Sequence, residues 1–491
     1  LWIVGSNGDA LLVVREGNTL AGRTVNGISF ASGSGGSDGL ARALNDQGQL
    51  AYGATFTDGA SGVFLFTPDL RWIASSSGAW DTRAHWTIAQ APGEVHAVRI
   101  DPSTSMTVTG PAAATTVKSL AVGGGSGIAT LALAGGPLTV VSGPLQVLAT
   151  GVLTGDGVVT SAVTNDGLVL AHNLRIDGGL TNRGELAGDG RLWARLVNNS
   201  AGTVRVADGE RMRVTNTGST AHSNSGLIEV RHGELEMSGQ TNNNATGRVV
   251  LDDAVVRFGT RLVNNGQLLV TTGESSVHGE VRTQNGGKTI LSGAAHATFY
   301  GTVEVRADSE LRVSSGATAV FFGPVYQRTG ALLTGTGTKY YEGGLFIGSS
   351  PGLSVDEGSV SFGGGNVFEV EIGGVLPGSG HDKLDVAGHL SFGGTLRLVS
   401  WDGFVAQAGD RFDLFDWGSA SGRFDRVAAA DLWLAPGTRL DMSRLYVDGS
   451  IGVAAVPEPG TYALMLGGLA AVLTVAARRR AHGSGSAAGL A

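Results

Sequence analysis

Leu227-Ile228-Glu229-Val230, Arg248-Val249-Val250-Leu251 and Gln267-Leu268-Leu269-Val270 are the segments that decide the fold of this chain. Each is short and rich in Val, Leu and Ile, as half-buried β-strands are. Between them lie turns such as Asn264-Asn265-Gly266, because asparagine and glycine supply the positive φ angles that tight turns need. The same theme runs from about residue 112 to residue 359. The sequence therefore predicts an all-β body.

The asparagine turns recur every 16 to 22 residues within each of two runs, first Asn165, Asn182 and Asn198 and then Asn224, Asn242, Asn264 and Asn285. A period near 20 with one turn per coil fits a solenoid whose coils stack and bury a continuous apolar column. Antiparallel hairpins packed as sandwiches would give the same local pattern. We favour a right-handed parallel β-helix. The asparagines could stack as ladders, but turn chemistry alone is the interpretation that we favour.

Composition excludes several classes of protein. Glycine contributes 80 of 491 residues, about twice the usual ~7%, and charged residues are only 15% against a typical ~25%. With 42% hydrophobic residues the chain has enough apolar surface to fold. A net charge of −8 with scattered Lys and Arg predicts no nucleic-acid partner. The absence of cysteine excludes disulfides and thiolate zinc sites.

The C-terminal tail carries three consecutive signals. Val456-Pro457-Glu458-Pro459-Gly460 cannot form regular structure and predicts an exposed linker. The uncharged stretch 461–477 is rich in helix formers, and at ~1.5 Å per residue it would cover most of a ~30 Å hydrocarbon core. Arg478-Arg479-Arg480 follow it, and the positive-inside rule keeps them cytoplasmic. The tail therefore predicts a single transmembrane helix with the body outside.

The order of these signals resembles the PEP-CTERM sorting signal. Pro457, Glu458 and Pro459 match its signature, and Arg478, Arg479 and Arg480 match its basic end. The resemblance implies that these residues are recognised by an exosortase-type sorting protease in a bacterium that makes exopolysaccharide. It also implies an exported protein of the cell envelope, cell surface or extracellular space, with transient inner-membrane anchoring through residues 461–477. One departure is the flexible tail at 481–491.

The rest of the chain divides into three further regions. Residues 1–70 resemble one copy of a repeat found in tandem in secreted, anchored proteins. Residues 71–360, opening with Gly78-Ala79-Trp80, resemble the β-helix of autotransporter passenger domains. Residues 361–453 are expected to form the last β segment of that solenoid. The chain begins at Leu1 without a leader, so we expect either a fragment or a removed signal peptide.

No catalytic constellation is convincing. Gly348-x-Ser350-x-Gly352 has the nucleophile-elbow spacing, but Pro351 and a further β pattern follow instead of a helix. Glu369 and Glu371 share one face of a strand, as acid/base carboxylates could, yet an ordinary solvated face is the simpler reading. We therefore expect no catalytic residue and no cofactor.

Metal binding is not expected either. A calcium site could use the carboxylates of Asp402, Asp410, Asp413 and Asp416, but their spacing among aromatic residues favours polar turns around a packed edge. The histidines are dispersed without pairs four residues apart, at His85, His96, His172, His222, His232, His278 and His296.

These observations predict an exported structural or adhesive protein of the cell surface or extracellular matrix, with exopolysaccharide or other surface proteins as partners. The alternatives are a carbohydrate-active β-helix enzyme, such as a polysaccharide lyase or hydrolase, and a carbohydrate-binding surface protein. Three or more carboxylates converging in a groove would favour the enzyme. A row of exposed aromatic residues would favour the binding protein, and a smooth Thr/Ser/Asn face would favour the adhesin.

Overall fold

The computed structural model describes residues 1–33, 41–216, 218–348, 351–456 and 459–483. The chain divides into two compact units. Unit 1 comprises residues 1–325 and 330–339, and unit 2 comprises residues 326–329 and 340–491. Both units are built mainly from β-strands, which confirms the all-β prediction.

Unit 1 opens with an antiparallel module. Strands β1 (Trp2–Val4) and β2 (Ala10–Leu12) form one pair. A second, four-stranded sheet follows, made of β3 (Thr19–Leu20), β4 (Arg23–Ser29), β5 (Leu50–Phe56) and β6 (Ser61–Phe66). Alternate residues of β5 are buried, so that Tyr52, Ala54 and Phe56 pack on Val14 and Val25. This period of two is what one buried sheet face requires.

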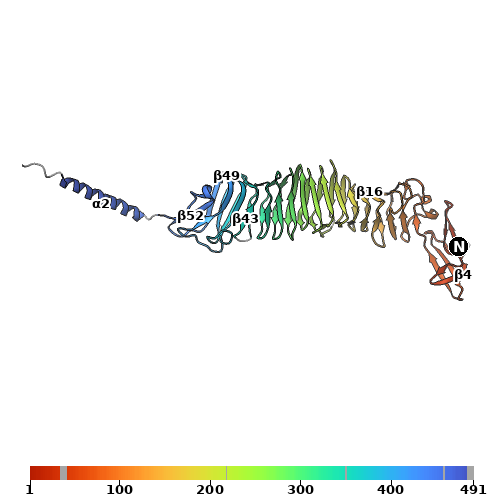
Figure 1. Ribbon diagram of the computed structural model, residues 1–491. Coiled ribbons are helices and arrows are strands. Elements are labelled where there is room, and N and C mark those ends of the chain that lie inside the picture. Colours follow the sequence, from red (N-terminus) through yellow and green to blue (C-terminus); the bar gives the residue numbers. More distant parts are fainter. Residues whose placement is uncertain (34–40, 217, 349–350, 457–458, 484–491) are drawn as a thin grey trace, which may run out of the picture. The chain divides into compact units, whose positions relative to one another are not determined.

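The chain enters a parallel sheet at β7 (Leu70–Arg71). From there most strands pair with the strand that comes three positions later in the chain. For example, β17 (Val163–Asn165) pairs with β20 (Leu180–Asn182), and β20 pairs with β23 (Leu196–Asn198). Each coil therefore has three strands and lies directly on the coil before it (Figure 1). The parallel solenoid is confirmed, and the alternative of hairpin sandwiches was wrong for this region.

Apolar columns fill the interior of the coils. Val163, Leu180 and Leu196 occupy one register position on successive coils and are almost completely buried. Burying each such side chain contributes about 1.5–3 kcal/mol. Every coil therefore covers the apolar face of its neighbour, as a solenoid requires.

One interior column is polar and runs along the turns. The Nδ2 of Asn165 donates to Oδ1 of Asn182 at 2.7 Å, and head-to-tail contacts of 2.7–2.8 Å continue along the column. Each side chain also donates to a backbone carbonyl, as Asn182 does to Thr203 at 3.0 Å. The members of this asparagine ladder are Asn165, Asn182, Asn198, Asn224, Asn243 and Asn264. Our preference for turn chemistry alone was wrong, because the amides also bond one coil to the next.

A glycine closes each of these turns for a steric reason. A Cβ at Gly247 would lie 2.2 Å from the Oδ1 of Asn243, and one at Gly226 would lie 2.2 Å from the carbonyl oxygen of Asn199. No side chain fits at that separation. The Asn-Gly spacing of the sequence thus reflects the close approach of successive coils as well as turn geometry.

Unit 2 contains parallel strands and an antiparallel sheet. Its parallel strands include β42 (Leu345–Ile347), β45 (Val367–Ile372), β46 (Lys383–Phe392), β47 (Thr395–Ser400), β49 (Phe415–Gly422) and β50 (Arg426–Asp431). An antiparallel sheet follows, made of β48 (Arg411–Asp413), β52 (Ser450–Ala455) and β51 (Thr438–Asp441), together with helix α1 (Leu445–Asp448). The region expected to be solenoid throughout therefore ends in an antiparallel cap (Figure 1).

A buried histidine interrupts the apolar interior beside the ladder. His222 is fully buried, and its Nδ1 accepts the backbone N–H of Leu196 at 3.1 Å. Burial lowers the pKa of His222 to about 4. Protonation would both bury a charge and remove this hydrogen bond.

Replacing Asn198 with Ala should lower the free energy of unfolding by about 3 kcal/mol, because the change leaves buried polar partners on both neighbouring coils without their bonds. The matched control is Asn199→Ala at the same turn, whose side chain forms no hydrogen bond among the described residues and should change stability by no more than about 0.5 kcal/mol. Urea denaturation of both variants tests this. Equal losses of unfolding free energy in the two variants would contradict the stabilising role of the asparagine ladder.

His222 should make unit 1 sensitive to acid. Its folded-state pKa lies below the ordinary histidine value of about 6.5, so its contribution is complete above pH 6.5 and is lost as the pH falls toward about 4. The loss amounts to about 3 kcal/mol. In His222→Thr, which copies the Thr241 that follows in the same column, this part of the pH dependence should vanish. Parallel pH profiles of unfolding for wild type and variant would refute the assignment.

Candidate functional site

The C-terminal tail begins immediately after the last strand of the cap. The backbone N–H of Val456 still bonds to the carbonyl of Gly437 at 2.7 Å. Pro457 and Glu458 lie outside the described residues, and Pro459 is the first residue of helix α2 (Pro459–Gly483). Helix α2 also contains Arg478, Arg479 and Arg480, and the first two of these are exposed (Figure 1).

The apolar side chains of α2 that are described are also exposed, at Leu464, Met465, Leu466, Leu469, Val472, Leu473 and Val475. A helix that is apolar on several sides and packed on nothing differs from a core helix. Among the helices of the described ranges, however, none combines the length and the apolar character that crossing a membrane requires.

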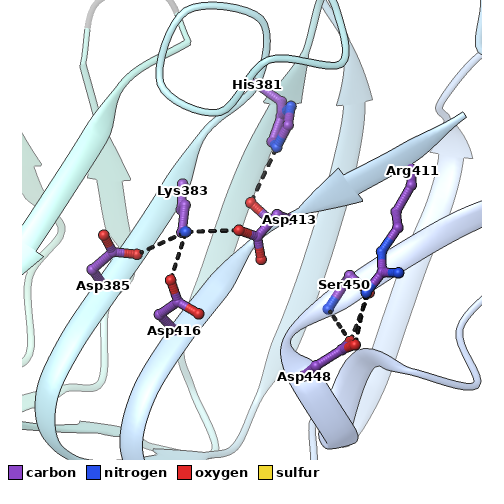
Figure 2. Close-up of polar contacts among 8 residues, drawn as sticks. All are labelled: His381, Lys383, Asp385, Arg411, Asp413, Asp416, Asp448 and Ser450. Carbon is purple, nitrogen blue, oxygen red and sulfur yellow. Dashed lines mark hydrogen bonds and ion pairs between the residues drawn. The ribbon is translucent and has the colours of Figure 1, made fainter.

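A lysine lies among three carboxylates in unit 2. The Nζ of Lys383 lies 2.7 Å from Asp413, 2.6 Å from Asp416 and 3.3 Å from Asp385 (Figure 2). Burial lowers the pKa of Lys383, but the hydrogen bonds to Asp413 and Asp416 outweigh burial, and the pKa is raised overall. The ammonium group is therefore firmly charged, and it offsets part of the negative charge of the three carboxylates.

This cluster revises the interpretation of the four aspartates considered for calcium. Asp413 and Asp416 converge, but on an ammonium group. Asp410 instead accepts the backbone N–H of Gln407 at 2.7 Å, and Asp402 occupies a turn with a φ of 48°. Within the described residues, no group of three or more His, Asp or Glu side chains is arranged to hold a metal ion.

A second polar group holds the cap together. The carboxylate of Asp448 accepts hydrogen bonds from Arg411 and from the hydroxyl of Ser450, both at 2.7 Å (Figure 2). It is also paired with Arg444. These donors, Arg444 foremost, hold the pKa of Asp448 well below its usual range. All of these partners belong to the cap itself, so the group is structural.

Glu369 and Glu371 share the outward face of β45, as their spacing predicted, while Val370 between them is buried. Glu369 is bonded to Arg397 at 2.5 Å. Next to them, Asp382 is 1% exposed and accepts the backbone N–H groups of Gly352 at 2.7 Å and Glu371 at 2.8 Å. Burial raises the pKa of Asp382 to about 7, and burial followed by repulsion from Glu369 raises that of Glu371.

These three carboxylates line one pocket of about 190 Å³ together with Tyr326, Arg328, Phe346, Ile347 and Gly348. The carboxylate of Asp382 accepts hydrogen bonds from two backbone N–H groups, and that of Glu369 is paired with Arg397. Among the described residues, only the carboxylate of Glu371 therefore lacks a hydrogen-bonding partner in this pocket. Sequence reasoning identified the two glutamates but missed Asp382, which lies 11 residues further along the chain. Ser350 of the nucleophile-elbow pattern lies outside the described residues.

Unit 1 also has a row of aromatic rings, at His278, Tyr300 and Phe322. Their centroids are 4.4 Å and 5.5 Å apart and the rings are nearly parallel. Stacking of each ring on its neighbour stabilises the stack of coils, and Tyr300 and Phe322 remain exposed at the surface.

Removing the ammonium group should create a cation site. In Lys383→Ala the three carboxylates would repel one another, and Ca²⁺, which prefers carboxylate oxygens, should relieve that repulsion. We expect calcium to raise the unfolding midpoint of this variant by about 3 °C or more and to leave wild type unchanged. The double variant Lys383→Ala/Asp416→Asn should respond less. A calcium response in wild type would contradict the assignment.

Comparison with protein families gives two matches, one at each end of the chain. Residues 1–68 match a family described as "Family of unknown function (DUF7453)". Residues 455–480 match the "PEP-CTERM protein-sorting motif". No curated protein matches the chain. The chain thus carries a PEP-CTERM sorting motif at residues 455–480, which implies an exported protein of the cell envelope or surface that is sorted by an exosortase.

Proposed function

We propose that this protein is a structural or adhesive component of the cell surface or extracellular matrix. The sorting motif supports delivery to that location, and it is the single observation that carries the proposal. The body supports the role, because its coils are filled by apolar columns and the asparagine ladder. A long β surface held together in this way suits a spacer or a binding surface.

The outer faces of the coils support the same role. Arg205 pairs with Glu185 at 3.0 Å and with Glu229 at 3.6 Å, and Arg231 pairs with the same Glu229 at 2.7 Å. The exposed pair of Arg205 with Glu185 is worth little, about 0–1 kcal/mol, whereas Glu229 is buried beneath its two arginines. The alternation of these pairs across coils keeps the faces charged and mixed in sign, which opposes aggregation of a secreted β protein.

The tail supports a mechanism of sorting. In this proposal, residues 461–477 hold the exported chain in the inner membrane, with Arg478 to Arg480 on the cytoplasmic side. The exosortase recognises Pro457, Glu458 and Pro459 and cleaves near them, so that the body passes to the envelope or matrix. The exposed apolar side chains of α2 suit this role, because in water they would be left uncovered.

We propose that the chain has no catalytic activity. The convergence of Glu369, Glu371 and Asp382 is the one observation that favours a carbohydrate-active enzyme. Glycoside hydrolysis needs two working carboxylates on either side of the scissile bond. Here Asp382 and Glu369 are already bonded, so the pocket suits binding better than cleavage.

Replacing Pro457, Glu458 and Pro459 with alanine should abolish sorting and leave the folded body unchanged. In the native host we expect wild type to be labelled by a membrane-impermeant reagent at the surface, and the variant to remain with the inner membrane. Pro436→Ala, an exposed proline of the cap, is the matched control. Surface labelling of the triple variant at the wild-type level would refute the proposed role of the motif.

A further inference from the structure

We infer that the pocket between Tyr326 and Glu371 in unit 2, which we call the flank pocket, binds one neutral sugar unit of a polysaccharide or glycan. The inference deepens the proposed adhesive function and rests on it, because it supplies the ligand class that the sorting motif leaves open. Its residues are Tyr326, Arg328, Phe346, Ile347, Gly348, Glu369, Glu371 and Asp382.

The pocket exists because one column of side chains lacks a member. Leu345 is in register with Phe368, and Gly348, just after strand β42, lines the same pocket as Glu371 on β45. Gly348 has no side chain and a φ of 79°, a conformation that glycine adopts without strain. The outward face is therefore hollow next to Glu371, with a volume of about 190 Å³. A hollow of this size is suited to a single pyranose ring.

The lining combines polar and apolar groups in the way that a sugar requires. Glu371 supplies a half-buried acceptor without a hydrogen-bonding partner among the described residues. Sugar hydroxyl groups are neutral donors that would satisfy it, and an acceptor left unsatisfied in such a place is costly. The guanidinium of Arg328 can donate to hydroxyl and ring oxygens.

Two stacked rings supply the apolar wall. The rings of Tyr326 and Phe346 lie 4.9 Å apart at an angle of 18°, and Arg328 lies over the Tyr326 ring at 5.0 Å. These contacts fix the wall in place before any ligand arrives. A pre-organised wall loses little conformational entropy on binding, and the C–H groups of a pyranose can pack against it.

The charges of the pocket argue against ionic ligands. An anion would meet the carboxylates of Glu369 and Glu371 against the single guanidinium of Arg328 in the lining. A divalent cation such as Ca²⁺ takes six to eight oxygen ligands. The pocket offers it one carboxylate, because those of Asp382 and Glu369 are engaged. A neutral, hydroxyl-rich ligand is what remains.

Saturation-transfer difference NMR on the purified full chain tests the inference. The probes are methyl α-glucopyranoside, methyl β-galactopyranoside, methyl α-mannopyranoside and N-acetylglucosamine at millimolar concentration. We expect at least one of them to receive saturation from wild type. In Glu371→Gln, which keeps the shape of the side chain, its affinity should fall by about tenfold. Phe346→Ala should weaken binding to a similar extent.

The matched control is Glu236→Gln, which changes an outward glutamate that is paired with Arg213 at 2.9 Å in unit 1, far along the chain from the pocket. It should bind the sugar as wild type does. Thermal unfolding of each variant separates loss of binding from loss of fold. The inference is overturned if none of the four sugars binds, if Glu371→Gln and Phe346→Ala both bind as wild type does, or if calcium alone occupies the pocket in a manner that depends on Glu371. None of these outcomes bears on sorting by the tail, which the alanine variant of Pro457, Glu458 and Pro459 tests separately.

Discussion

Coil-to-coil bonding of buried polar groups is the constraint on which this structure depends. A three-sided coil must turn sharply at its corners, and asparagine makes such a turn at the cost of placing an amide inside. That amide is bonded partly within its own turn, where the Nδ2 of Asn198 donates to the carbonyl of Gly202 at 3.1 Å. It also bonds to the next coil, as the Nδ2 of Asn182 does to the Oδ1 of Asn198 at 2.8 Å. The ladder therefore couples the fold of each coil to that of its neighbour, and the glycine that closes each turn lets the coils approach closely enough for the bond to form.

The same stacking determines where functional chemistry can arise. Side chains that face outward form columns along the solenoid, so a change in one member of a column creates a local feature. Gly348 empties one position and leaves a hollow beside Glu371. Lys383 places an ammonium group between Asp385, Asp413 and Asp416, and it reduces the repulsion among these three carboxylates. The hollow beside Glu371 and the charge cluster around Lys383 thus both arise from the stacking of coils.

Much of this architecture could be predicted from local sequence. The Asn-Gly turns and the apolar strands between them predict stacked parallel coils, and the Pro-Glu-Pro stretch with its basic end predicts the sorting motif. The asparagine ladder was not the favoured prediction. Turn propensity can be read from neighbouring residues, whereas the hydrogen bond between two asparagines joins residues of different coils. The coil length also varies: Asn182 and Asn198 are 16 residues apart, but Asn198 and Asn224 are 26 apart. With such variation, spacing alone could not align Lys383 with Asp413, or Asp382 with Gly352.

The central claim is that the chain is exported and released from its tail by sorting at the PEP-CTERM motif. Intact-mass analysis of the mature protein, isolated from the surface or surroundings of its native host, tests it most directly. The account predicts a C-terminus near Pro459, with helix α2 and the arginine cluster removed. A mature protein that still extends to Ala491 and remains with the inner membrane would contradict it.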